Sequence, residues 1–226
     1  MTFESAVRLT EILLALALAQ QSLEHLRGPR RDRLLFAGRI GLCGLVILGL
    51  AQPWPLVGLA VLSLAILQRY QGPYNGGSDR MGLLALWCLT LARVLPEPAW
   101  RELAFGYLGL QLVLSYVISG WVKVINPDWR SGRALGDVFR FSAYPVSEDL
   151  RGWAERPRVL AAMSWAVMGF ELAMPLTLIS RETLIAGLAA AAAFHLANAC
   201  LFGLNRFFWT WLAAYPAILW LQARFF

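Results

Sequence analysis

The stretch LAFGYLGLQLVLSYVISGWV, residues 103–122, contains no charged side chain and is followed by a single lysine, Lys123. A helix rises about 1.5 Å per residue, so about 20 apolar residues cross a bilayer core that is about 30 Å thick. The stretch has this length and composition, and it therefore predicts a membrane-spanning helix. Beyond Lys123 the chain turns polar at Asn126-Pro127, which predicts that the helix ends near a membrane surface.

The composition of the whole chain is also typical of a membrane protein. Its 226 residues are 58% hydrophobic and 15% charged, whereas a soluble domain is about half apolar and about a quarter charged. The net charge of +6 does not indicate nucleic-acid binding, because the basic residues lie between apolar runs, where lipid headgroups account for them. Cys43, Cys88 and Cys200 lie inside apolar runs without zinc-ligand spacing, so no metal site is predicted.

Further hydrophobic segments predict an all-α, polytopic helical bundle in the membrane. These segments are residues 7–26, 40–68, 81–94, 159–180, 183–204 and 207–223. Pro53-Trp54-Pro55 divides the segment 40–68 into two helices, which gives about eight hydrophobic helices in all. The segment 7–26 is interrupted by polar residues, so it either spans or lies at the interface, and the predicted count is seven to eight spans. No linker marks a second domain, so residues 1–226 are expected to form one transmembrane domain.

The basic residues are distributed unevenly between the two predicted faces. Fourteen of the 20 lysines and arginines follow the first, third, fifth and seventh helices, and only four lie on the other side. Basic residues concentrate in cytoplasmic loops of membrane proteins. We therefore expect an integral protein of a bacterial inner membrane, with the basic face in the cytoplasm. The two longest links, 69–80 and 124–157, lie on this face.

Ionisable side chains inside the hydrophobic segments are candidates for function, because an unpaired charge in lipid costs several kcal/mol. Glu171 lies in the middle of its segment, and Arg39 and Arg93 lie near segment ends. The simplest interpretation is a structural ion pair between Glu171 and Arg39 or Arg93. The alternative for Arg93 is that its long side chain reaches the membrane surface.

Lys123, His195 and Asn198 form a second group of candidates. His195 and Asn198 are three residues apart, so they share one face of a helix that should point into the bundle. Two interpretations remain open for Lys123. A lysine at the end of a span is usually an interfacial anchor. The alternative is an ammonium that is placed to do chemistry. His195 is either a hydrogen-bonded core residue or part of a pocket.

The link 69–81, RYQGPYNGGSDRM, carries turn signals at Gly72-Pro73 and Asn75-Gly76-Gly77. Asp79 is expected to cap the next helix or to favour its positive end. The alternative is that Asn75 and Asp79 contact a ligand, since two glycines allow a close approach of the backbone.

Two stretches resemble one known family. YVISGWVKVINPDWRSG, residues 116–132, resembles the Tyr-x-x-x-Gly-x-x-Lys-x-x-x-x-x-Trp-x-x-Gly motif of vitamin K-dependent gamma-carboxylase and its bacterial relatives, the HTTM (horizontally transferred transmembrane domain) proteins. FHLANACLFGLNRFFWTWLA, residues 194–213, resembles the Phe-His-x-x-Asn-x-x-Leu-Phe helix of the same family. These motifs cover a small part of the chain, whereas the helix pattern covers most of it.

The resemblance implies a site for a quinone. In the carboxylase a lysine at the matching helix end is the base that acts on vitamin K hydroquinone, and Lys123 is the matching residue here. Trp121 and Trp129 would supply aromatic walls, and His195 and Asn198 would supply polar contacts to the ligand. A lysine that acts as a base must lose its proton part of the time, and apolar surroundings favour that loss.

The chain also departs from the family pattern. The animal enzyme has two adjacent lysines, whereas Val124 follows Lys123 here, and Asn75-Gly76 replaces an Asn-His pair that relatives carry. The large extramembrane domain that holds the peptide substrate is not part of these 226 residues. These departures argue against carboxylation of peptides.

Three functions therefore remain open. The first is a binding or accessory subunit that holds a quinone-like or lipid-like ligand in a membrane complex. The second is a carboxylase-like oxidoreductase in which Lys123 acts as the base. The third is a purely structural or assembly protein. Quinone or hydroquinone is the expected cofactor class, and the expected partners are the lipid bilayer and other membrane subunits.

Overall fold

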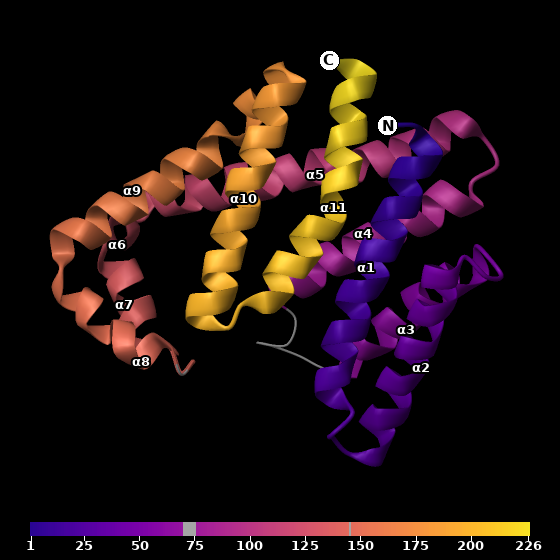
Figure 1. Ribbon diagram of the computed structural model, residues 1–226, viewed down its shortest axis with the longest axis horizontal. Helices are drawn as coiled ribbons and strands as arrows, with labels where there is room; N and C mark the ends of the chain where they lie inside the picture. The colour runs from indigo at the N-terminus through magenta and orange to yellow at the C-terminus, as the bar shows by residue number, and fades with distance from the viewer. Residues whose placement is uncertain (70–75, 145) are drawn as a thin grey trace. The chain divides into compact units, whose positions relative to one another are not determined.

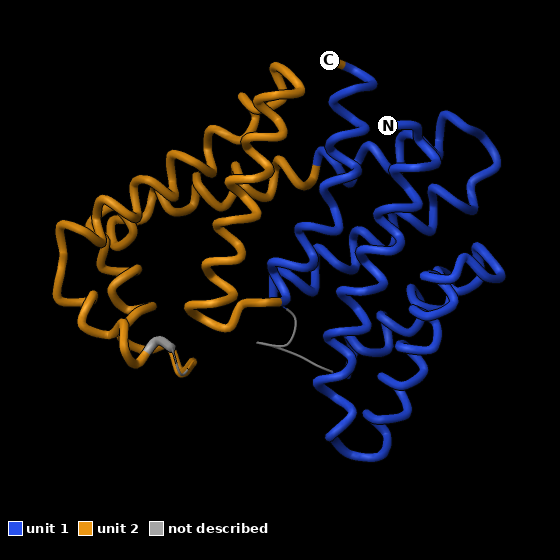
Figure 2. The backbone as a smooth tube through the Cα atoms, viewed as in Figure 1, with its two compact units in different colours: residues 1–110, 206–225 blue, residues 111–205, 226 orange. Residues whose placement is uncertain are grey.

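The computed structural model describes residues 1–69, 76–144 and 146–226, and every regular element among them is helical (Figure 1). The prediction of an all-α protein is therefore confirmed. The chain forms two compact units (Figure 2): unit 1 contains residues 1–110 and 206–225, and unit 2 contains residues 111–205 and 226. Each unit is described by itself. That residues 1–226 act as one transmembrane domain stays a prediction.

Unit 1 is a helical bundle built from both ends of the chain. It contains α1 (Phe3–His25), α2 (Arg30–Leu48), α3 (Trp54–Arg69), α4 (Gly77–Val94), the first half of α5 (Pro98–Ile125) and nearly all of α11 (Asn205–Phe225). The break predicted near residues 53–55 is confirmed, because α2 ends with Gly49 in the left-handed conformation and α3 begins at Trp54. Gly109 allows α5 to approach α11 closely, since a Cβ there would lie 3.0 Å from the Ala217 carbonyl oxygen.

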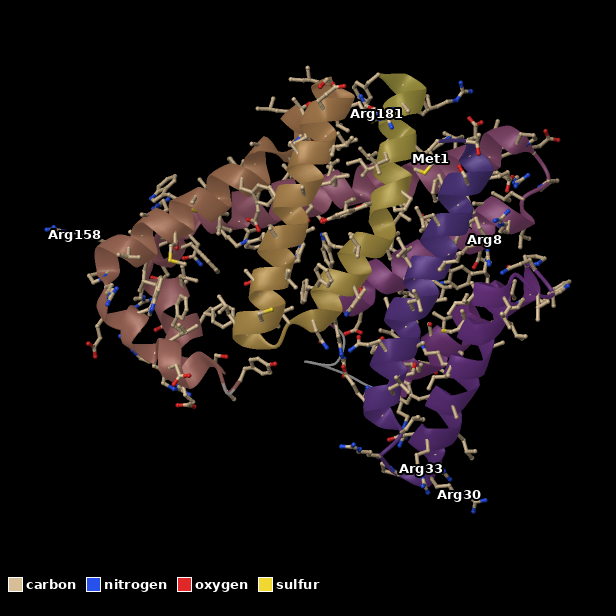
Figure 3. The ribbon with its side chains drawn as sticks, viewed as in Figure 1. Met1, Arg8, Arg30, Arg33, Arg158 and Arg181 are labelled. Atoms are coloured by element: carbon tan, nitrogen blue, oxygen red, sulfur yellow. The ribbon has the colours of Figure 1, made fainter. Side chains whose placement is uncertain are left out.

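Arginines lie at both ends of unit 1. Arg30 and Arg33 lie at one end, and Met1 lies at the other (Figure 3). Arg8, near the Met1 end, donates hydrogen bonds to the carbonyls of Val46 and Ile47 at 2.7 and 2.6 Å. This arginine satisfies carbonyl groups at the end of α2 that have no partner within the helix.

Unit 2 combines three long helices with several short ones. It contains the second half of α5, α6 (Pro127–Arg130), α7 (Arg133–Phe141), α8 (Val146–Leu150), η2 (Arg151–Glu155), α9 (Pro157–Ala173), η3 (Met174–Ile179) and α10 (Arg181–Phe202). The link 124–157 therefore folds largely into short helices. Asn126 accepts a hydrogen bond from the backbone N–H of Asp128 at 2.9 Å and caps α6. The break in α5 predicted at Asn126-Pro127 follows from this cap and from the proline.

The short helices pack against the long ones through a glycine and an aromatic residue. Gly132 has φ of +81°, and a Cβ there would lie 2.5 Å from the Ala161 backbone nitrogen, so α9 passes directly over this turn. Phe139 is 2% exposed, and its ring packs edge-on against Phe202 of α10 with 5.1 Å between centroids. The amphipathic segment after Lys123 thus buries one side against α9 and α10.

Four helical segments among the described residues are long and apolar enough to cross a membrane. They are Phe3–His25, Pro98–Ile125, Pro157–Ile179 and Arg181–Phe202. The helix Trp54–Arg69 is apolar but shorter. All eight predicted helices exist, but the count of seven to eight spans is not confirmed. α2 carries charges in its first turn and at Arg39, and α4 has only 18 residues and contains Asp79, Arg80 and Arg93.

Candidate functional site

One face of α5 in unit 2 carries Tyr116, Ser119, Gly120 and Lys123, at the helical spacings of three, four and seven residues. Gly120 lets α9 come close to this face. A Cβ at Gly120 would lie 3.0 Å from Glu171 Cβ, a contact that a larger side chain would have to displace. The glycine of the sequence motif therefore sets the distance between the lysine helix and the helix that carries Glu171.

Lys123 and Glu171 form an ion pair across this contact. Lys123 Nζ lies 2.5 Å from Glu171 Oε1 and 2.6 Å from Oε2, and it also donates to Ser119 Oγ at 2.7 Å. The side chains of Lys123 and Glu171 are only 15% and 4% exposed. The half-buried Trp129 places its ring 5.3 Å from Nζ, a cation–π distance. Lys123 is therefore a half-buried ammonium whose three donors all have oxygen partners within unit 2.

The ion pair corrects one expectation from the sequence. Glu171 is paired, as expected, but its partner is Lys123 and not Arg39 or Arg93. The reason is geometric, because Gly120 brings Glu171 within reach of the lysine one helical turn further along α5. The sequence alone predicted that Lys123 is an anchor at the membrane surface or a residue that contacts a ligand.

His195 lies in the same unit and is 5% exposed. Its Nε2 lies 2.8 Å from the hydroxyl of Tyr116, one to two turns before Lys123 on the same α5 face. Phe170 and Phe194 pack around this pair, with centroids 5.8 Å from Tyr116 and 5.2 Å from His195. The motif tyrosine and the motif histidine are thus direct partners.

The remaining predicted site residues are distributed differently. Asn198 is half-buried and donates to the carbonyl of Phe194 on its own helix at 3.1 Å. Trp121 is 59% exposed on α5. Asn75 lies outside the described residues, so its contact with a ligand stays a prediction. Asp79 is in unit 1, in the first turn of α4, where Gly76 rather than Ser78 or Asp79 occupies the N-cap position.

Arg93 belongs to an ion cluster in unit 1 that sequence reasoning missed. Its guanidinium contacts Glu11 and Glu4, each at 2.6 Å, and Arg8 contacts Glu11 at 3.1 Å. The Glu11 side chain is fully buried. The signal was present as Arg8 and Glu11 at a three-residue spacing, which places them on one face of the first helix.

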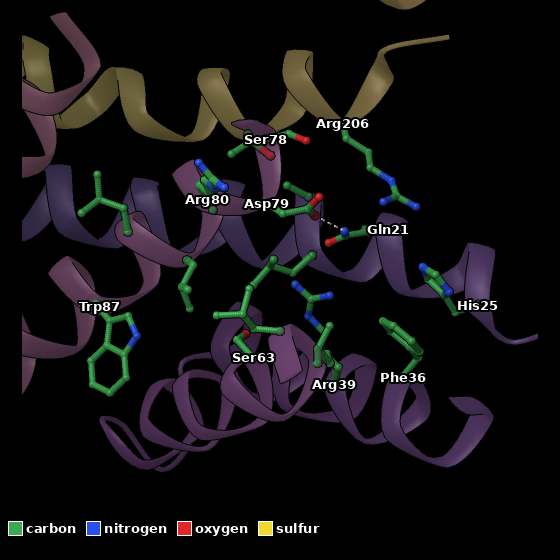
Figure 4. Close-up of a pocket in the computed structure, with 18 residues that line it drawn as sticks. Gln21, His25, Phe36, Arg39, Ser63, Ser78, Asp79, Arg80, Trp87 and Arg206 are labelled. Carbon is green, nitrogen blue, oxygen red and sulfur yellow. Dashed lines mark hydrogen bonds between the residues drawn. The ribbon is translucent and has the colours of Figure 1, made fainter. Parts of the chain in front are cut away.

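A pocket of about 550 Å³ is the second feature of unit 1 (Figure 4). Side chains from α1, α2, α3, α4 and α11 line it. At the polar end of the pocket, Gln21 donates a hydrogen bond to Asp79 at 2.6 Å. Arg39, which is 5% exposed, extends from α2 toward this pair. Asp79 therefore lines a cavity of unit 1, whereas Lys123, His195 and Asn198 belong to unit 2.

The cluster in unit 2 has a definite chemical character. An ammonium has three N–H donors, and three oxygens, two of Glu171 and one of Ser119, lie within 2.7 Å of Lys123 Nζ. All three donors of the ammonium are therefore taken within the cluster, and a ligand oxygen has to displace one of these oxygens to bind Nζ.

The long apolar helices with paired charges in their interiors define an integral membrane protein of the helical class. The model of the HTTM domain matches residues 92–222, which is more than half of the chain. The chain therefore belongs to the HTTM family. The match includes all of the unit 2 residues that form the Lys123–Glu171 and Tyr116–His195 pairs. No curated protein and no solved structure matches the chain.

Proposed function

We propose that this HTTM protein is a binding or accessory subunit of a membrane complex and that unit 2 holds a quinone-like or lipid-like ligand. The observation that carries the proposal is the row of paired polar groups along one face of α5. Tyr116 with His195 and Lys123 with Glu171 lie along a helix that is long and apolar enough to span a membrane. Polar groups inside a span are costly and mark ligand sites in many membrane proteins.

The row is suited to a ligand with oxygens at two ends. Tyr116 and Lys123 are seven residues apart, which separates them by about 10 Å along the helix axis. Trp129 beside Lys123 and the phenylalanines beside His195 supply aromatic surface at both pairs. A flat, apolar ring system with polar oxygens combines the two properties that these residues recognise.

The second candidate function is a carboxylase-like oxidoreductase in which Lys123 acts as a base on a hydroquinone. The observation in its favour is that Lys123 is largely enclosed and lies against Trp129. In that function the amine must first leave Glu171, because a base needs a free lone pair. Binding requires only that a ligand oxygen replace the Ser119 hydroxyl as an acceptor for Nζ, without loss of the proton, so binding is the better supported function.

The cellular context follows from the same proposal. The protein resides in a bacterial inner membrane with its basic face in the cytoplasm, where anionic lipids attract arginines. Large apolar side chains such as Ile118 and Trp165 are 58% and 50% exposed, and they contact lipid or neighbouring subunits in the membrane. A purely structural role is the alternative that the following experiment separates.

The test is retention of a quinone by the purified protein. The chain is purified in a mild detergent, extracted with solvent and analysed for quinones and lipids by mass spectrometry, and binding of decylubiquinone is measured by quenching of tryptophan fluorescence. Lys123→Arg and His195→Phe should remain folded but lose the ligand, because arginine presents a larger planar fork and phenylalanine has no polar contact. Trp165→Leu, a change at an exposed position of α9, is the control and should bind like the parent.

Each outcome has a clear meaning. Loss of binding in the two site variants but not in the control supports the proposal. If the parent retains no quinone or lipid and binds no decylubiquinone, the ligand-holding function is refuted and the structural role remains. If the parent oxidises a hydroquinone and Lys123→Arg abolishes oxidation but not binding, the oxidoreductase replaces the binding subunit.

A further inference from the structure

The side chain of Arg39 is the most unusual charged group in the protein. It is 5% exposed, and its Nε and Nη1 atoms have no hydrogen-bond partner among the residues that the structure describes. Burial of a cation without a partner costs several kcal/mol even after the protein relaxes. Arg93, the other arginine of a predicted span, has two carboxylate partners. Asp79 of the unit 1 pocket attracts the guanidinium through space, but it makes no hydrogen bond with Nε or Nη1.

Arg39 lines a cavity that is large enough to hold an anionic ligand. The pocket of about 550 Å³ falls within the range of about 300–1,000 Å³ that is typical of small-molecule sites. Figure 4 shows Arg39 extending toward Gln21 and Asp79, with Arg80 and Arg206 also at the cavity. Arg39 thus lines the pocket, while its Nε and Nη1 atoms are themselves enclosed.

The charges around the cavity favour an anion. Three arginines, Arg39, Arg80 and Arg206, line it against one carboxylate, Asp79. Arg206 pairs with Glu24 at 2.6 Å, and Asp79 accepts its hydrogen bond from the neutral Gln21. No ion pair joins Asp79 to Arg39, although both line the cavity and are described by the structure. Asp79 is also placed in the first turn of α4, where the helix dipole favours a negative charge.

Most of the remaining lining is apolar, although Ser63, Ser78 and Thr210 also belong to it. Leu18 of α1, Ile66 and Leu67 of α3, and Leu83 and Leu84 of α4 form its wall. Phe36 stacks on His25 with 4.0 Å between ring centroids at another side. A small inorganic anion would contact Arg39 but leave this apolar wall against water, at a cost of about 25 cal/mol for each Å² left uncovered. The occupant must therefore combine an anionic group with a hydrocarbon body.

We propose that this pocket of unit 1 binds a single-chain anionic amphiphile. Its carboxylate or phosphate group accepts hydrogen bonds from Arg39, and its hydrocarbon chain lies against the leucines of α1 and α4 and the α3 wall. The planar guanidinium suits both oxyanions, because its parallel N–H groups match two oxygens of either group. The site is separate from the unit 2 residues of the proposed function and stands without it.

The experiment measures binding of defined probes to the full chain in a neutral detergent by native mass spectrometry and calorimetry. The probes are laurate and lauryl phosphate, with methyl laurate as the neutral amphiphile and inorganic phosphate as the free anion. Laurate or lauryl phosphate should bind the parent, and Arg39→Met should weaken that binding by at least about tenfold, the loss expected for charge-assisted hydrogen bonds. Arg33→Met, the same change at an exposed position of α2, should bind like the parent.

A second variant keeps the test decisive if Arg39→Met folds poorly. Leu83→Trp fills the cavity without touching the guanidinium, and it should also weaken laurate binding by at least about tenfold. Equal binding of laurate and methyl laurate would overturn the role of Arg39, and tight binding of inorganic phosphate alone would overturn the amphiphile. Unchanged binding by Leu83→Trp would show that the probe lies elsewhere on the protein.

Discussion

The buried pair of Lys123 and Glu171 makes a quantitative prediction about stability. Its nitrogen–oxygen distances of 2.5 and 2.6 Å correspond to a Coulomb energy of about 6 kcal/mol at an effective dielectric constant of about 20. Desolvation of the two ions offsets much of this energy. Removal of one partner, however, leaves the other charge buried, so Lys123→Met should lower the free energy of unfolding by about 3–5 kcal/mol.

A double-mutant cycle separates the pair from the effects of the individual side chains. Lys123→Met, Glu171→Gln and the double variant are unfolded in mixed micelles of dodecyl maltoside and sodium dodecyl sulfate, and the free energies are compared. The double variant has no orphaned charge, so it should be more stable than Lys123→Met, and the coupling energy should reach about 2 kcal/mol or more. Ser119→Ala, which removes the hydrogen bonds from Lys123 and to Glu171 but no charge, should cost about 1–3 kcal/mol.

The result that would refute this reasoning is additivity. If the losses of the two single variants simply sum in the double variant, the ion pair contributes nothing measurable. Lys123 would then be an interfacial anchor whose contact with Glu171 has no energetic weight, and the proposed site in unit 2 would lose its central interaction.

Three further predictions concern packing, charge and topology. Gly120→Ala should lower the free energy of unfolding by about 1–3 kcal/mol, because its Cβ would lie 3.0 Å from Glu171 Cβ. Gly169→Ala is the matched control in the same unfolding assay. A Cβ at Gly169 would meet no atom within 4 Å, so this change should instead stabilise α9 by about 0.5–1 kcal/mol. Arg93→Met should lower the melting temperature of the protein in detergent, since the fully buried Glu11 would keep only its longer contact to Arg8. An unchanged melting temperature would contradict a role of this ion cluster in stability. Ser131→Cys in a cysteine-free background should react with a membrane-impermeant maleimide in inverted bacterial vesicles but not in right-side-out vesicles, and the reverse pattern would reverse the predicted orientation.

The helices and the breaks between them were predictable because their signals are local, whereas some starts were not, since α2 begins at Arg30 and not near residue 40. A run without charges, a Pro-Trp-Pro break and an Asn-Pro break each act through neighbouring residues, and the structure places helix ends at these positions. The number of spans was less predictable. Length and charge within one helix do not decide whether it crosses a membrane when packing in a bundle shelters its polar groups.

The partners of the charged residues were the least predictable part of the site. The sequence identified Glu171, Lys123, His195, Arg39 and Arg93 as unusual. It could not pair Glu171 with Lys123, because that contact joins residues 48 positions apart through the close approach at Gly120. Nor could it separate Arg93, which has carboxylate partners, from Arg39, which has no hydrogen-bond partner for Nε and Nη1 among the described residues.

The sequence by itself determined that this protein is helical, belongs in a membrane and matches the HTTM domain over residues 92–222. Composition and periodicity suffice for these properties because each residue contributes to them through its own hydrophobicity and its nearest neighbours. Only the tertiary structure decided which charges neutralise each other and where a cavity remains. A charge interacts with whatever lies within a few ångströms in space, and that neighbour comes from another helix, whose approach depends on small residues such as Gly120 and Gly109.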